Sequence, residues 1–320
     1  SVRMPMATLG PGGPVVSRIG LGLAALGRPA YITGGRGGDL PDRSVAGLRT
    51  QSHTVLDAAH AAGIRYVDAA RSYGRAEEFL GGWLAARDHP DVVVGSKWGY
   101  RYVGDWRLDA DRHEIKEHSL AMFTAQLAES RALLGDRIAL YQVHSLTADS
   151  GLFEDRELLS ALAQLRAGGV QVGLSTSGPG QAATIRRALP LTVDGLPLFG
   201  AAQVTWNPLE PSVGPAAAEA ASAGWAILIK ESLANGRLAP GGDVAGHLAG
   251  LAAEYGVSED AIALAAALAN QWATVVLSGA VTPAQLRANL AALDVRHLPS
   301  LDLAEPPGAY WAARSARAWA

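Results

Sequence analysis

The chain has 320 residues, of which 49% are hydrophobic and 18% charged, and its formal net charge is −3. This composition supplies a large apolar core. It lacks the basic excess that is typical of proteins that bind nucleic acids or anionic membrane surfaces. The absence of cysteine excludes disulfides, thiolate nucleophiles and cysteine-based zinc sites. We therefore expect a cytoplasmic protein without a bound metal, whose partner is a small molecule rather than nucleic acid or a membrane.

Short β-branched runs alternate with amphipathic stretches rich in alanine and leucine along the whole chain. The predicted strands cover residues 18–23, 65–68, 92–97, 138–143, 170–175, 201–206, 225–230 and 274–278. The predicted helices cover residues 52–62, 76–86, 115–134, 154–167, 180–189, 215–223, 244–255 with 259–270, and 283–293. Eight such alternations predict a parallel (β/α)8 barrel, with residues 1–320 as one domain. A doubly wound open sheet is the alternative, but no G-x-G-x-x-G turn follows an early strand.

Two segments interrupt this alternation, and both follow the ends of predicted strands, where barrel enzymes build their active sites. Residues 29–48, after the first strand, are rich in glycine and equally compatible with a solvated surface loop. The loop at residues 99–113, after the third strand, holds or adjoins four aromatic side chains, which are Trp98, Tyr100, Tyr102 and Trp106. This aromatic density favours a substrate-binding wall over a solvated linker.

Four polar residues stand at or just after the ends of three successive predicted strands. Asp68 ends the second strand and Tyr73 follows it in the next loop, while Lys97 ends the third strand and His144 follows the fourth. Each alone is compatible with a structural role, such as a loop cap or a core histidine. Because the strand ends of a barrel converge around one mouth, all four are predicted to meet there.

This set of residue types suits the reduction of a carbonyl group. Hydride transfer to carbon leaves negative charge on oxygen, which needs a proton donor, and a free phenol has a pKa near ~10. A lysine ammonium is expected to lower the phenol pKa, a carboxylate to hold the lysine, and an imidazole to hydrogen-bond the substrate oxygen.

The segments DAARSYG, GSKWG and YQVHS resemble the aldo-keto reductase motifs that supply an Asp/Tyr/Lys/His tetrad. The resemblance runs from residue 17 to about residue 293 and includes SRIGLG, GLSTSG, QVTWNPLEP, ESLANGRL and SGAVTPAQLRANL in barrel order. It implies that Tyr73 is the general acid/base, that Lys97 and Asp68 tune it, and that His144 orients the carbonyl. It also implies that the C-terminal tail GAYWAARSARAW lies over the barrel mouth and, with Trp98, Tyr100, Tyr102 and Trp106, walls the substrate pocket.

The same resemblance implies a nicotinamide dinucleotide, gripped at its carboxamide by Ser175, Thr176 and Gln203. Lys230 stands where relatives carry the aromatic residue that stacks on the nicotinamide, and Asn289 matches their adenine contact. The full set of residues implied for the cofactor is Gly22, Ser175, Thr176, Gln203, Trp206, Lys230, Ser232, Leu233, Asn235, Gly236, Gly279, Thr282, Gln285, Arg287 and Asn289.

The choice between NADP and NAD depends on the segment SGAVTPAQLRANL. Gly279 and Gln285 align with the basic residues that many relatives use for the 2′-phosphate, which leaves Arg287 as the nearby cation. Thr282 and Gln285 also form the start of a well-capped helix. The expectation is use of NADP(H) with only a modest preference over NAD(H).

Three other functions compete with a carbonyl reductase. A sugar dehydrogenase of the same family would run in the oxidative direction with NAD. A Schiff-base aldolase would use Lys97 as its nucleophile. A non-catalytic barrel would bind cofactor without turnover, although an intact tetrad argues against it.

Overall fold

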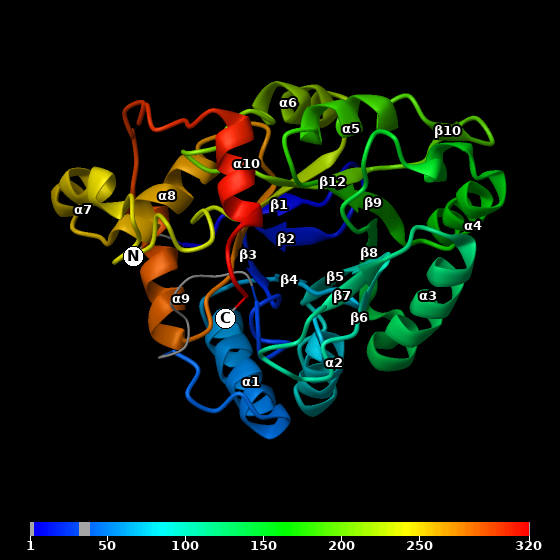
Figure 1. Cartoon of the computed structure of the whole chain (residues 1–320), viewed down its shortest axis with the longest axis horizontal. Coiled ribbons are helices and arrows are strands. Elements are labelled where there is room, and N and C mark those ends of the chain that lie inside the picture. The colour runs from blue at the N-terminus through cyan, green and yellow to red at the C-terminus, as the bar shows by residue number, and fades with distance from the viewer. Residues whose placement is uncertain (1–2, 32–38, 320) are drawn as a thin grey trace.

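The computed structural model describes residues 3–31 and 39–319. Its centre is a closed barrel whose eight parallel strands neighbour one another in the order β12-β13-β14-β3-β4-β5-β8-β9. The barrel strands are β3 (Ile19–Gly22), β4 (Tyr66–Asp68), β5 (Val93–Trp98), β8 (Ile138–Val143), β9 (Gln171–Ser175), β12 (Ala201–Thr205), β13 (Ala226–Lys230) and β14 (Val275–Ser278). Helices surround this ring (Figure 1). The predicted (β/α)8 barrel is confirmed, and the open-sheet alternative is wrong.

A short antiparallel hairpin precedes the barrel, formed by β1 (Met6–Thr8) and β2 (Val15–Ser17). Leu9 and Val16 of this hairpin are fully buried and pack with apolar side chains of five barrel strands, namely Tyr66, Leu140, Ala201, Ala226, Leu228, Val275 and Leu277. The barrel is therefore filled at its N-terminal end. A ligand site is therefore expected at the opposite end, where the strands finish.

The helices bury their apolar faces against the outside of the barrel. In chain order they are α1 (Val45–Ala61), α2 (Ala76–Ala86), α3 (Leu120–Leu134), α4 (Arg156–Ala167), α5 (Gln181–Ala188), α6 (Gly214–Ser222), α7 (Ala249–Tyr255), α8 (Glu259–Leu268), α9 (Pro283–Leu290) and α10 (Pro307–Ser315). Within the described residues, no helix is sufficiently long and apolar to cross a membrane.

The first helix begins earlier than its apolar pattern predicted. α1 starts at Val45 instead of residue 52, because the Ser44 hydroxyl accepts a hydrogen bond from the Gly47 amide at 3.0 Å and caps the helix. The predicted loop at residues 29–48 is correspondingly shorter. Its residues 32–38 lie outside the described residues.

The loop after β5 also differs from its prediction. Residues 114–116 form strand β7 (Glu114–Lys116) in place of the start of a helix, and β7 pairs with β6 (Tyr100–Tyr102) as a hairpin. α3 begins only at Leu120, where Ser119 caps the Met122 amide at 3.1 Å. The segment predicted as an irregular aromatic loop is therefore largely a hairpin at the barrel mouth.

Smaller elements without a counterpart among the predictions include the following three. A short hairpin of β10 (Thr192–Val193) and β11 (Leu196–Pro197) precedes β12, and a 3-10 turn at Ala245–Leu248 replaces the first turn of the helix predicted over 244–255. The C-terminal helix α10 is the third, and it packs beside the segments that follow β12 and β13 (Figure 1).

Candidate active site

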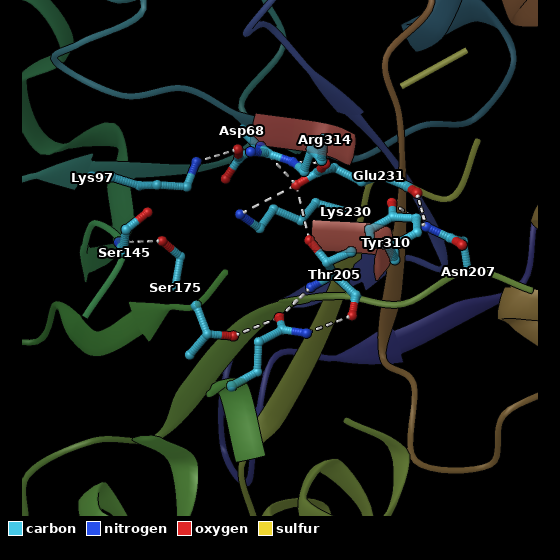
Figure 2. Close-up of polar contacts among 12 residues, drawn as sticks. Asp68, Lys97, Ser145, Ser175, Thr205, Asn207, Lys230, Glu231, Tyr310 and Arg314 are labelled. Carbon is cyan, nitrogen blue, oxygen red and sulfur yellow. Dashed lines mark hydrogen bonds and ion pairs between the residues drawn. The ribbon is translucent and has the colours of Figure 1, made fainter. Parts of the chain in front are cut away.

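The four predicted catalytic side chains meet at the C-terminal end of the barrel. The Lys97 Nζ atom lies 2.5 Å from Asp68 Oδ2, 3.0 Å from the Tyr73 hydroxyl and 3.2 Å from the carbonyl oxygen of Ala69. Figure 2 shows the Lys97–Asp68 ion pair at this end of the barrel. Lys97 and Asp68 are buried, with side-chain exposures of 1% and 3%, so the pair is held in a region from which water is largely excluded.

Asp68 is fixed by two further donors, which are the Tyr66 hydroxyl at 3.3 Å and the Gln203 amide at 3.0 Å. Burial and the Asp68 carboxylate raise the pKa of Tyr73 well above its usual value of 10.0. This differs from the expectation that Lys97 lowers it, because burial disfavours the charged phenolate and the Asp68 carboxylate repels it. The Tyr73 phenol is therefore protonated at neutral pH, and Lys97 donates a hydrogen bond to its oxygen.

His144 completes the group from the end of β8. Its ring meets the Tyr73 ring edge-on with centroids 5.7 Å apart, and its Nδ1 lies 3.4 Å from the Ser72 hydroxyl. Burial, and then the positive charges of Lys97 and Lys230, lower the pKa of His144 well below 6.5. The imidazole is neutral at physiological pH and retains one N–H donor.

A cavity of about 750 Å³ opens beside this group. Asp68 and Tyr73 line one end of it. Ten of the residues predicted for the cofactor also line it, namely Gly22, Gln203, Lys230, Ser232, Leu233, Asn235, Gly236, Gly279, Gln285 and Asn289. The structure thus brings residues from β3, β12, β13, β14 and α9 together around one cavity.

Two of the predicted carboxamide contacts are buried beneath the cavity and do not line it. The Ser175 hydroxyl accepts a hydrogen bond from the Ser145 amide at 2.8 Å, as Figure 2 shows. The Thr176 hydroxyl donates to Gln181 Oε1 at 2.9 Å. Of the three residues, only Gln203 faces the cavity, and it does so while donating to Asp68.

Three further residues predicted for the cofactor lie off the cavity. Trp206 packs edge-on against Trp272 with centroids 6.4 Å apart. Thr282 caps α9 by accepting from the Gln285 amide at 3.1 Å. Arg287 is exposed on α9, on a part of the helix that does not line the cavity. The structure therefore does not bring Arg287 to the cavity beside the other residues predicted for the cofactor.

The aromatic residues predicted to form the substrate wall separate into two groups. The Tyr100 ring lies 5.0 Å from the His144 ring, within the active site. Trp98 is fully buried against Phe123 at 5.0 Å, because its side chain points out of the barrel towards α3. Trp106 donates its indole N–H to the Arg43 carbonyl at 2.8 Å and packs against α2. The structure therefore does not bring Trp98 or Trp106 to the tetrad.

A different wall, which the sequence analysis did not identify, stands over Tyr73. The Arg28 guanidinium lies 5.1 Å from the Tyr73 ring centroid and 4.7 Å from that of Trp319. The Trp319 ring in turn stacks on His113 at 4.6 Å and meets Tyr31 edge-on at 5.7 Å. Of this wall, the sequence predicted only that the C-terminal tail, which carries Trp319, lies over the barrel mouth.

The C-terminal helix is joined to the barrel by a buried charge cluster at the end of β13. The Glu231 carboxylate accepts hydrogen bonds from Arg314 at 2.7 and 3.2 Å and from the Thr205 hydroxyl at 2.9 Å (Figure 2). Lys230 Nζ lies 3.7 Å from the same carboxylate. Burial, opposed by Glu231, lowers the pKa of Lys230 to about 8. The cavity therefore loses one positive charge between neutral and mildly alkaline pH.

Glu231 is expected to contribute to acid sensitivity. Burial raises its pKa, but Arg314 and Lys230 outweigh burial and lower it from 4.5 to about 2. A carboxylate with a lowered folded-state pKa stabilises the protein fully above about pH 4.5, and this contribution is lost as the pH falls towards about 2. Urea unfolding at pH 6 and pH 3 should therefore show a smaller loss of stability for Glu231→Gln than for the unmodified protein. Equal losses would contradict this assignment.

Comparison with known proteins identifies a family for the chain. Residues 18–305 match the family model described as the aldo/keto reductase family. Over 146 aligned positions the chain is 34% identical to aldo-keto reductase str7 of Strobilurus tenacellus, and the alignment covers 44% of this chain and 37% of that protein. Over 225 aligned positions it is 28% identical to a D-threo-aldose 1-dehydrogenase of a Pseudomonas species, and the alignment covers 65% of this chain and 66% of that protein.

Solved structures share the same fold. An aldo-keto reductase from Bacillus halodurans, AKR11C1 in its holo form, superposes with a TM-score of 0.69 at 21% identity, covering 98% of this chain and 96% of that one. A Pseudomonas aeruginosa protein described as a candidate aldo-keto reductase gives a TM-score of 0.66 at 25% identity, covering 90% and 94%. With the family model spanning the whole barrel and an Asp/Tyr/Lys/His group at its mouth, the chain belongs to the aldo/keto reductase family of oxidoreductases.

Proposed function

We propose that the protein reduces aldehyde or ketone groups, or oxidises the corresponding alcohols, with a nicotinamide dinucleotide and with Tyr73 as the general acid/base. The observation that carries this proposal is the contact of the Tyr73 hydroxyl with Lys97 at 3.0 Å, where Tyr73 lines the cavity. The Tyr73 phenol is protonated, buried and oriented, as a proton donor to a developing alkoxide must be.

The cavity has features that suit a dinucleotide. Its volume lies in the usual range for cofactor sites. The Ser232 hydroxyl lines it, is buried, and has no hydrogen-bond partner among the described residues. Gly22, Gly236 and Gly279 also line it and leave backbone groups accessible to a ligand. In this proposal Ser232 and these glycines hold the dinucleotide, which when bound would supply or accept the hydride.

The other catalytic groups then have distinct tasks. The neutral His144 imidazole donates its N–H to the substrate oxygen and so orients the carbonyl. Lys97 donates to the Tyr73 oxygen, which leaves the phenol hydrogen free to point at the substrate. When the carbonyl carbon gains a hydride, its oxygen takes the Tyr73 proton, and Lys97 stabilises the phenolate that remains. In alcohol oxidation the same proton returns to Tyr73.

The Schiff-base alternative is disfavoured by the contacts of Lys97. A nucleophilic amine needs a lone pair, whereas the three hydrogens of the Lys97 ammonium donate to Asp68, Tyr73 and Ala69. The sugar dehydrogenase alternative keeps the same chemistry and is favoured by the similarity to a D-threo-aldose 1-dehydrogenase. Aldoses are therefore included among the test substrates.

The direct test is an assay of NADH, NADPH, NAD⁺ and NADP⁺ against a panel of aldehydes, ketones, alcohols and aldoses. We expect turnover with at least one substrate class, measured as a change in the absorbance of the reduced cofactor. Dinucleotide binding without turnover on any of them would favour a non-catalytic barrel. Trapping of substrate on Lys97 by borohydride would favour an aldolase.

The wall above Tyr73 is proposed to contact substrate. Because Trp319 stacks on His113 and covers Arg28, Trp319→Ala should open the mouth beside the Tyr73 ring. We expect KM for the best substrate to rise several-fold while the Kd of the dinucleotide stays unchanged. Trp272→Ala, which removes a tryptophan that packs on Trp206 away from the cavity, is the matched control. Equal KM values for the two variants would place the tail outside the substrate site.

A further inference from the structure

We propose that Asp39, held by Gln285, makes the outer end of the cavity selective for NAD(H) over NADP(H). This inference rests on the proposed function, because it concerns the same dinucleotide. It reverses the preference expected from the sequence alone, and it depends on how charges are distributed along the cavity.

The orientation of a bound dinucleotide follows from the elements to which the lining residues belong. Asp68, at the end of β4, and Tyr73, in the loop that follows, line the cavity at the barrel mouth, which is its inner end. Gln285 and Asn289 belong to α9 in the outer ring of helices, which marks the outer end (Figure 1). The nicotinamide must reach a carbonyl held at Tyr73, since hydride transfer requires contact. The adenosine ribose of the same molecule therefore lies towards α9 and β14.

The outer end carries two carboxylates. Asp39 Oδ2 accepts a hydrogen bond from Gln285 Nε2 at 2.9 Å, and Asp260 Oδ2 accepts one from Asn289 Nδ2 at 2.6 Å. Both aspartates line the cavity. Asp260 is buried, whereas Asp39 is exposed at the edge of the cavity.

The cations that line the described part of the cavity lie elsewhere. Lys230 is at the inner end beside Glu231. Arg237 donates to both oxygens of Glu305 at 2.8 Å and is also paired with Asp243. Arg317 lies on the side of α10. Among the described residues, neither aspartate at the outer end has a cationic partner, so the charge that the described side chains place there is negative.

Gln285 fixes the position of Asp39. Its side-chain oxygen accepts from the Val281 amide at 3.0 Å, and its main-chain amide donates to Thr282. With the oxygen held, the Gln285 NH₂ group points towards Asp39. The loop after β3 and the start of α9, which are 246 residues apart in the chain, are therefore joined at the cavity edge.

This arrangement distinguishes the two cofactors by charge. A carboxylate accepts a hydrogen bond from a ribose 2′-hydroxyl, as it does in other dinucleotide sites. A 2′-phosphate brings roughly −1.5 to −2 charges at neutral pH, by analogy with other phosphomonoesters, and is repelled by Asp39 and Asp260. Because Asp39 is exposed, solvent and salt weaken the repulsion without removing it.

The test is equilibrium binding of NADH and NADPH, measured by calorimetry in low salt on the full chain. We expect NADH to bind about ten-fold more tightly, or better. Asp39→Asn keeps the side-chain shape and removes the charge. It should therefore lower the ratio of the Kd for NADPH to the Kd for NADH by about ten-fold, mainly by improving NADPH binding. Asp109→Asn makes the same charge change at an exposed position off the cavity and should leave the ratio unchanged.

The outcomes separate this inference from the proposed function. NADPH binding as tightly as NADH, or an unchanged ratio in Asp39→Asn, would overturn the selectivity alone. Failure of both dinucleotides to bind would overturn the proposed function and the selectivity together. A preference for NADPH that disappears in Arg287→Ala would restore the expectation drawn from the sequence and contradict the role of Asp39.

Discussion

Replacing Tyr73 by phenylalanine is expected to lower kcat by about 10²–10⁴-fold, the usual contribution of a positioned general acid. The substitution removes the hydroxyl that contacts Lys97 and leaves the ring against His144. Because the ring and its packing remain, the Kd of the dinucleotide and the free energy of unfolding should change little. The measurements are steady-state kinetics, binding calorimetry and urea unfolding on the same preparations.

Tyr102→Phe is the matched control, since it also removes one phenolic hydroxyl near the mouth. That hydroxyl accepts from the Trp106 amide at 3.0 Å and does not contact the tetrad. We expect this variant to keep most of its activity. If Tyr73→Phe retained activity similar to Tyr102→Phe, proton transfer would have to be assigned to another group.

The second large effect is expected from Lys97→Met, which removes the ammonium paired with Asp68 at 2.5 Å. Loss of one partner of a buried ion pair typically costs about 3–5 kcal/mol, because the other charge stays buried. Tyr66 and Gln203 still donate to Asp68, so the lower end of this range is expected. Turnover should fall as well, because the Tyr73 phenolate loses its stabilising cation.

The double variant Lys97→Met with Asp68→Asn separates stability from catalysis. It leaves no unpaired buried charge, so the free energy of unfolding should recover most of what Lys97→Met loses. Its kcat should remain low, because no ammonium contacts Tyr73. Recovery of both quantities would mean that Lys97 acts only as the structural partner of Asp68.

Local pattern was sufficient to locate most of the barrel. The eight strands and the helices between them follow from runs of β-branched residues and from helical periodicity, which depend on near neighbours in the chain. The boundaries of α1 and α3 were wrong because they depend on single capping side chains, Ser44 and Ser119. The β6–β7 hairpin was missed because its pairing requires contact between residues 100–102 and 114–116.

The tetrad could be found from the sequence because each of its members is tied to the end of a strand. Once a closed barrel is predicted, strand ends share one mouth, and Asp68, Lys97 and His144 need no further information to converge. The aromatic wall was predicted less well. Trp98 sits on a strand whose side chains alternate between the two faces of the barrel wall, and its neighbour Lys97 already faces inward, so the indole points outward.

The sequence by itself determined the barrel, its catalytic end and the residue types that meet there, since these depend on periodicity and on the order of elements. Only the tertiary structure decided which charged and polar side chains lie in contact. The contacts of Asp39 with Gln285 and of Glu231 with Arg314 join positions 246 and 83 residues apart. No local pattern encodes such contacts, because they arise from loops and a terminal helix whose positions are fixed only when the barrel closes.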